Sequence, residues 1–324
     1  MLRLPLLWQT IVGLLPLAYS SSAVSAEIPR SGELSLRLFY PGVVSRDFAI
    51  GDSDIAPGTN LSTGGEVDHG RLAIVGGTLL TAFAVIHLYQ QNGWWKDNRT
   101  AFHFQEDLVY GLNVDKIGHI YGTHVMAYTM SGSLRWANVS QVPALWMGSA
   151  GALLFETYLE MEDGFSSWGF DRVDFAADVV GAAWPVLRHY LPALQTLDLK
   201  ASYHPSDLLG STGGIGFRGQ QHLVLDDYEG QTFWLSVKVH SLLSESLKQY
   251  WPEFLGLAVG YGARDIAERN PYRVYFVSLD LDMTKVIPQT SGFLKGLGEV
   301  LNFIHLPLPA VQISPGTVWY GVYF

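Results

Sequence analysis

The segment DKIGHIYGTH, residues 115–124, places acidic and basic side chains in a run that is otherwise apolar or small. Asp115 and His119 are four residues apart and therefore share one face of a helix, with Lys116 beside them. A carboxylate and an imidazole on one face can transfer protons or bind a metal ion. His124 falls on a different face, which makes it the weaker candidate.

Two later apolar segments also present acidic faces. Glu156 and Glu160 are four residues apart, as are Asp174 and Asp178. An unpaired ion buried in an apolar setting is costly, so these groups should compensate one another or line a wet cavity. Lys116 is the natural counter-ion. The predicted site therefore consists of Asp115, Lys116, His119, Glu156, Glu160, Asp174 and Asp178.

Three interpretations of this cluster stay open. The carboxylates and imidazole could bind Mn, Fe or Zn through His119, Glu156, Glu160 and Asp178. They could act without a metal, with a carboxylate of raised pKa as acid or base beside His119. They could also simply fasten three helices together. The residues identify no cofactor, and they leave the presence of a metal unknown.

Two nearby acids have simpler structural explanations. Asp171 in the sequence DRVD fits a helix N-cap, with a second carboxylate at the third helical position. Asp163 precedes Gly164, and this pair is typical of the turn that follows a helix.

Four segments of unusual apolarity must position the site. Small residues recur along them, and helices that approach closely in an apolar setting use such residues. The first segment has the length and composition of a membrane span and ends in an aromatic and basic group, although a soluble bundle would also suit it. We predict helices over residues 72–89, 114–131, 142–162 and 174–190.

After Pro192 the pattern changes to short segments rich in β-branched and aromatic residues. The last one ends on an aromatic residue, as strands of outer-membrane barrels do, but five or six strands are too few for such a barrel. We therefore predict a sheet that packs on the helices or against a membrane surface, interrupted by one amphipathic helix at 291–304. The predicted strands are TLDLKASY, QTFWLSVKV, LGLAVGYGA, YRVYFVSLDLDM and TVWYGVYF.

The predicted organisation is an α+β chain. Residues 1–26 read as a signal peptide with a basic start, an apolar centre and small residues before cleavage. A strand and a polar loop follow over 27–70. Residues 71–192 form a membrane-associated bundle of about four apolar helices, and residues 193–324 form an antiparallel β-sheet half.

Composition limits the environment and the partners. The chain has no cysteine, which excludes disulfides, thiolate metal sites and lipid attachment to an N-terminal cysteine. Only 15% of its residues are charged, and the net charge is -10. The acidic balance argues against nucleic acid as a partner, and the low charge suits contact with membrane lipids. We predict an exported protein of the bacterial cell envelope, on the periplasmic side or at the outer membrane.

The motifs resemble a known family. DKIGHIYGTH and FETYLEMEDGFSSWGFDRVDFAADVVGAAW are similar to the signature of the YfiM-type family of envelope lipoproteins of unknown function. A weaker likeness reaches VanZ-like membrane proteins. In both patterns an Asn stands where this chain has Asp178, which adds a negative charge here. The matching positions are Asp115, Lys116, His119, Glu156, Asp174 and Gly181.

Three functions fit these observations. The first is an envelope membrane protein that binds a lipid headgroup or glycan precursor through the buried cluster. The second is an acid/base or metal-assisted hydrolase or transferase that acts on a lipid-linked substrate, with Lys116 stabilising negative charge. The third is a structural scaffold of the envelope.

Overall fold

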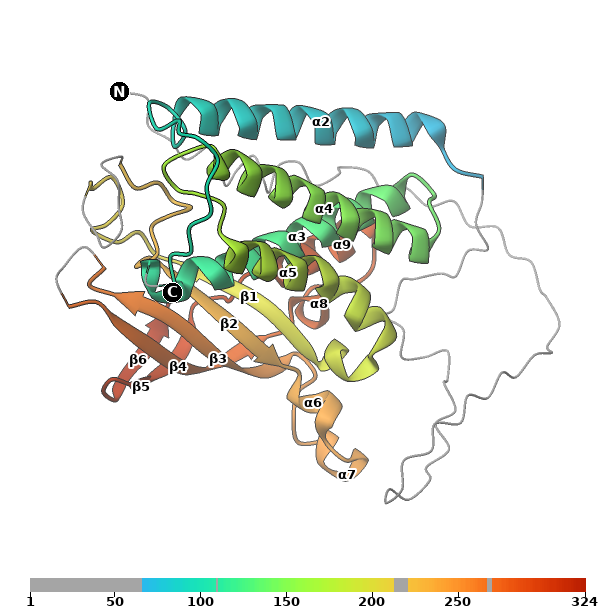
Figure 1. Ribbon diagram of the computed structural model, residues 1–324. Coiled ribbons are helices and arrows are strands. Elements are labelled where there is room, and N and C mark those ends of the chain that lie inside the picture. Colours follow the sequence, from blue (N-terminus) through green and yellow to red (C-terminus); the bar gives the residue numbers. More distant parts are fainter. Residues whose placement is uncertain (1–65, 109, 213–220, 267–269) are drawn as a thin grey trace, which may run out of the picture.

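The computed structural model describes residues 66–108, 110–212, 221–266 and 270–324. The predicted signal peptide, the predicted strand after it and nearly all of the polar loop before residue 70 lie outside these residues. Within the described part, helices come first and a six-stranded antiparallel sheet follows, so the chain is α+β as predicted (Figure 1).

The four long helices occupy the predicted segments, with ends that differ by a few residues. α3 lies at the centre and packs against both α4 and α5, while α2 lies along the outer side of α4, away from the sheet (Figure 1). Phe83 of α2 stacks on Phe155 of α4, with ring centroids 4.1 Å apart. The helices are α2 (His69–Asn92), α3 (Val114–Trp136), α4 (Gln141–Gly164) and α5 (Arg172–Tyr190).

Among the described helices, α2 is the one that is long and apolar enough to cross a membrane. The expected bundle of about four membrane-associated helices is therefore not shown. The physical reason is that α3, α4 and α5 carry acids and bases in their interiors, which lowers their hydropathy. These helices bury Asp115, Glu160 and Asp178 against one another rather than presenting a uniformly apolar surface.

The strands pair in sequence order, each antiparallel to the next. Short helices connect some of them, and α9 (Gly292–Leu301) is the predicted amphipathic helix. The strands are β1 (Leu197–Tyr203), β2 (Gln231–Val237), β3 (Leu255–Arg264), β4 (Tyr272–Leu281), β5 (Leu308–Ser314) and β6 (Val318–Tyr323). The connecting elements are η1 (Tyr110–Asn113), η2 (Pro192–Thr196), α6 (Val239–Leu242), α7 (Glu245–Lys248) and α8 (Met283–Val286).

The strand β5 is missing from the predicted set. It contains Pro309, which lacks an N–H for the ladder and lowers the strand signal of its segment. The pairing of β5 with β6 is irregular between Leu308 and Ala310, so the proline sits where the regular ladder is already interrupted.

Helix α3 joins the two parts of the fold. Gly118 of α3 faces the ring of Phe233 in β2, and Tyr121 packs on the same ring with centroids 5.5 Å apart. The Tyr121 hydroxyl also donates to the Phe303 carbonyl oxygen at 2.8 Å. The sheet therefore supports the helix that carries the predicted site.

Candidate functional site

The site forms where α3 and α5 approach most closely. Gly181 of α5 makes this approach possible, because a Cβ there would lie 2.3 Å from the backbone oxygen of Ile120. The contact brings the acidic face of α5, with Asp174 and Asp178, against Lys116 and His119 of α3. Helix α4 contributes its own acids from the other side.

Lys116 is surrounded by carboxylates. Its Nζ atom lies 2.8 Å from Asp171, 2.9 Å from Asp174, 3.1 Å from Asp115 and 2.5 Å from Asp107. Burial lowers the pKa of Lys116, but the negative charges of Asp115 and Asp174 and the hydrogen bonds to the other acids outweigh it and raise the pKa. Lys116 is therefore a permanent internal cation.

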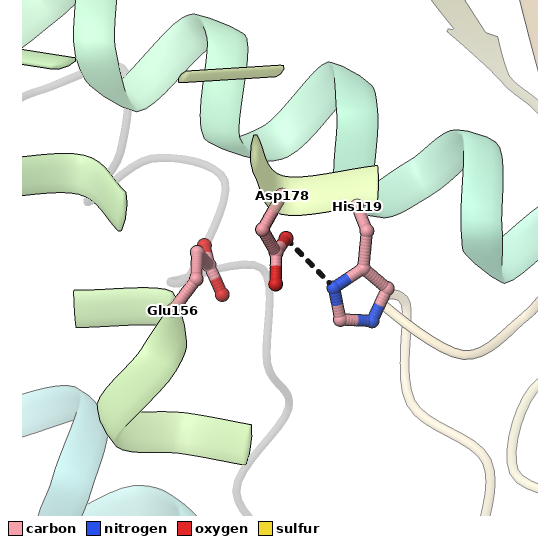
Figure 2. Close-up of side chains that lie close together, drawn as sticks. All are labelled: His119, Glu156 and Asp178. Atoms are coloured by element: carbon pink, nitrogen blue, oxygen red, sulfur yellow. Dashed lines mark hydrogen bonds and ion pairs between the residues drawn. The ribbon is translucent and has the colours of Figure 1, made fainter. Parts of the chain in front are cut away.

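His119 and Asp178 form the second half of the site. The His119 Nδ1 atom lies 3.0 Å from Asp178 Oδ1, and the Thr123 hydroxyl donates to the same oxygen at 2.8 Å. Figure 2 shows Asp178 between His119 and Glu156. Ligand atoms of His119, Glu156 and Asp178 all lie within 4.8 Å of one another.

Asp178 is left with an unsatisfied oxygen. Its side chain is completely buried, and Oδ2 has no hydrogen-bond partner among the described residues. The same holds for Oδ1 of Asp174. Buried polar atoms are nearly always paired, so each of these oxygens has room for a partner, which a water, an ion or a proton on the carboxyl group would supply.

Two glutamates of α4 favour their neutral forms. Burial raises the pKa of Glu156 to about 8, with a further contribution from the charge of Asp178, and burial raises the pKa of Glu160 to about 9. For His119, burial lowers the pKa, but the hydrogen bond to Asp178 and the charge of Asp174 raise it well above its usual value. The cluster carries more acid than its two cationic side chains can neutralise.

Two further groups have the spacing of metal ligands. One combines His119, Glu160 and Asp174, and the other combines Asp107, Asp115 and Asp174. The second already surrounds the Lys116 ammonium. In the first, Asp174 Oδ2 pairs with Lys116, and Glu160 accepts the Asp171 backbone N–H at 3.1 Å.

The structure brings all seven predicted site residues together. It adds three acids that sequence reasoning placed elsewhere or did not consider. Asp107 lies in the irregular segment before α3, where no periodicity marks it. Asp171 is the predicted N-cap of α5, which is confirmed by its bonds to the Val173 and Asp174 N–H groups, and it also binds Lys116. Asp163 accepts the Trp95 indole N–H at 2.5 Å.

His124, the weaker candidate, is not part of the cluster. It is buried and packs against Phe303 with ring centroids 5.5 Å apart. Burial lowers its pKa to about 3, so the imidazole is neutral at physiological pH.

Comparison with known proteins gives one match. Searches of curated proteins and of solved structures found none. Residues 102–190 match the model of a family described as predicted periplasmic lipoprotein (DUF2279). The matched segment contains Asp107 and the whole of α3, α4 and α5, and therefore the entire acidic cluster. Over this segment the chain is similar to an uncharacterised family of envelope proteins. The predicted location, in the cell envelope after export, is confirmed by this similarity.

Proposed function

We propose that the chain is an envelope protein whose helical part binds a divalent metal ion between His119, Glu156 and Asp178. The observation that carries this proposal is the fully buried Oδ2 atom of Asp178, which lacks a hydrogen-bond partner among the described residues and lies beside Glu156. Two carboxylates without a cation between them destabilise the fold unless one is protonated.

Charge and distance both suit such an ion. Metal binding would displace the protons that Glu156 and His119 hold in the metal-free protein, so that Glu156 and Asp178 supply two negative charges and His119 supplies a nitrogen ligand. The 3.0 Å separation of His119 Nδ1 and Asp178 Oδ1 matches that of adjacent ligands at right angles, about 3.0 Å for metal bonds of roughly 2.1 Å. His119 Nε2 lies 3.9 Å from Asp174 Oδ2, which is within ion-pair distance but beyond that of a hydrogen bond.

The ligand set indicates the kind of ion. Mixed carboxylate and imidazole ligands suit Mn, Fe or Zn better than Ca or Mg. The side chain of His119 is 28% exposed, so water can reach the site from that side. A bound ion there would lower the pKa of a coordinated water and polarise a substrate oxygen, which is the chemistry of hydrolysis or group transfer. We propose Glu160, whose pKa burial raises to about 9, as the proton donor.

For Lys116 we propose a role that differs from the one predicted from the sequence. All four of its neighbours are carboxylates, so its N–H groups are already used and cannot stabilise an anionic substrate. An anionic headgroup or glycan precursor would also meet an excess of acid. We therefore propose that a lipid-linked substrate binds through the metal ion, and that Lys116 holds the surrounding carboxylates in place.

Metal analysis of the purified chain tests the proposal. The wild type should retain about one equivalent of a transition metal after dialysis, and Glu156→Gln and Asp178→Asn should lose it. Glu162→Gln is the matched control on the same helix, because Glu162 pairs with Arg99 at the surface. Since a ligand that binds the folded state stabilises it, the metal should also raise the melting temperature of wild type and control.

A different result would reject the metal. If the wild type holds none after incubation with Mn, Fe and Zn salts, and its melting temperature is unchanged by each salt and by a chelator, the cluster only fastens the helices. In that case the two glutamates carry protons in place of a metal ion.

A further inference from the structure

One face of the sheet, called the inner face here, carries buried polar and charged side chains. Lys200 and Asp280 form an ion pair of 2.6 Å on the inner face, and both side chains are almost completely buried. Trp234 on the same face stacks on His305 with ring centroids 3.9 Å apart. The segment that carries His305 also pairs with the free edge of β1, through an N–H bond from His305 to the Ala201 carbonyl. The sheet thus encloses its own core.

The outer face is apolar from one edge of the sheet to the other. Paired residues of antiparallel strands lie on the same face, so the register defines continuous rows across the sheet. One row crosses all six strands without a charged or polar side chain. It consists of Leu199, Leu235, Val259, Val277, Val311 and Trp319.

Helix α3 and the residues just before it cover this face near β1, β2 and one end of β3, where they meet Ala201, Phe233 and Ala263. Beyond that contact the row is exposed as far as the described residues go: Val259 is 53% exposed, Val277 is 39% exposed and Trp319 is 79% exposed. The neighbouring row continues the pattern with Leu257 and Leu279, which are also exposed. An antiparallel sheet with one wet face normally has the opposite arrangement, with polar side chains outside.

We propose that this outer face lies against the acyl chains of a lipid bilayer. Strands that face lipid alternate apolar side chains on the outside with polar side chains on the inside. The sheet has this alternation, because its ions are buried on the inner face and its outer rows are apolar. The end of the face supports the same occupant, because Arg273 and the tyrosines Tyr261 and Tyr275 gather there. Aromatic rings and a basic group suit the boundary between acyl chains and anionic headgroups.

Fluorescence quenching by lipids tests the contact directly. The full chain would be mixed with vesicles of phosphatidylethanolamine and phosphatidylglycerol, either with brominated acyl chains or without them. Bromine quenches only tryptophans at the depth of the acyl chains, so Trp319 should be quenched and Trp319→Phe should remove most of that quenching. This conservative variant preserves the aromatic contact and the fold. Equal quenching in wild type and Trp319→Phe would overturn the proposal.

Vesicle flotation gives an independent test. A charge on the lipid face is costly, so Val277→Glu should weaken vesicle binding about tenfold or more. The matched control is Leu154→Glu on α4, where the wild-type side chain is 70% exposed but lies outside the sheet. If the control loses binding and Val277→Glu does not, the helices contact the membrane instead. If the wild type forms dimers without lipid and Val277→Glu is monomeric, the face binds a second copy. Either result rejects the proposal.

Discussion

Asp171 joins the start of α5 to the middle of the acidic cluster through its bond to Lys116. One carboxylate oxygen accepts the backbone N–H groups of Val173 and Asp174, and the other lies 2.8 Å from Lys116 Nζ. Burial raises the pKa of Asp171, but the hydrogen bond from Lys116 and those from the backbone lower it further than burial raises it. The cap that begins the helix is thus also part of the charge balance of the site.

Replacing Asp171 should separate these two roles. Asp171→Asn keeps an oxygen for the cap and removes one charge from Lys116, whereas Asp171→Ala removes both. We expect Asp171→Ala to unfold in less urea than Asp171→Asn, with a difference of about 0.5–2 kcal/mol from the cap. The measurement is urea unfolding followed by circular dichroism. Equal stability of the two variants would show that the cap contributes little.

The raised pKa values of the glutamates predict how the metal-free protein responds to pH. As the pH rises above about 4.5, the unfolded chain releases the protons of Glu156 and Glu160, while the folded chain holds them until about pH 8 and 9. The folded state then binds more protons than the unfolded state, so stability falls as the pH rises through this window. Thermal unfolding with a chelator present should show a melting temperature that decreases from pH 5 to pH 9.

Substitution of Glu160 checks the origin of that decrease. Glu160→Gln is uncharged at every pH and can still accept the Asp171 N–H, so it should be more stable than wild type at pH 9 and similar to it at pH 5. Glu162 pairs with Arg99 at the surface in the wild type. The melting temperature of Glu162→Gln should therefore depend on pH as that of the wild type does. A profile for Glu160→Gln that parallels wild type would assign the pH dependence to other groups.

Thr123 positions Asp178 without contacting the proposed metal. Its hydroxyl donates to Asp178 Oδ1 at 2.8 Å, opposite the unpartnered Oδ2. Removing a bond that orients a ligand typically lowers metal affinity 10–100-fold, so we expect a loss of about that size in Thr123→Val. Competition with a metal-binding dye measures the affinity.

The control for this variant is Thr157→Val on α4. Among the described residues, the Thr157 hydroxyl donates to the Leu153 backbone oxygen alone, within its own helix. This variant should bind metal as the wild type does. A similar loss in both variants would point to a general loosening of the helices rather than to the orientation of Asp178.

The sequence was informative where spacing alone places side chains on one face. Acids four residues apart on α4 and α5 could be assigned to a shared site because helical periodicity holds within each segment. Asp107 could not be assigned in this way, since only the tertiary fold brings its irregular segment to Lys116. Similarly, alternation predicted the strands, but it could not tell which face is enclosed. That depends on the register, which pairs Leu235 with Val259 and leaves both outside.

The close approach of α3 and α5 at Gly181 predicts a strong effect of adding a single methyl group. In Gly181→Ala the new Cβ would lie 2.3 Å from the Ile120 carbonyl oxygen and 3.1 Å from the His124 nitrogen, both backbone atoms. The helices must separate, which typically costs about 1–3 kcal/mol and here also moves Asp178 away from His119. Gly181→Ala should therefore lose both stability in urea and metal affinity.

Gly122→Ala on α3 provides the comparison, because nothing lies within 4 Å of the Cβ it would add. Alanine favours a helix over glycine by up to about 1 kcal/mol, so this variant should be as stable as wild type or more stable. It should also keep its metal affinity, because Gly122 makes no contact with the acidic cluster. If Gly181→Ala behaved like Gly122→Ala in both measurements, α3 and α5 would not approach closely at Gly181. The His119–Asp178 contact would then not depend on a glycine at that position.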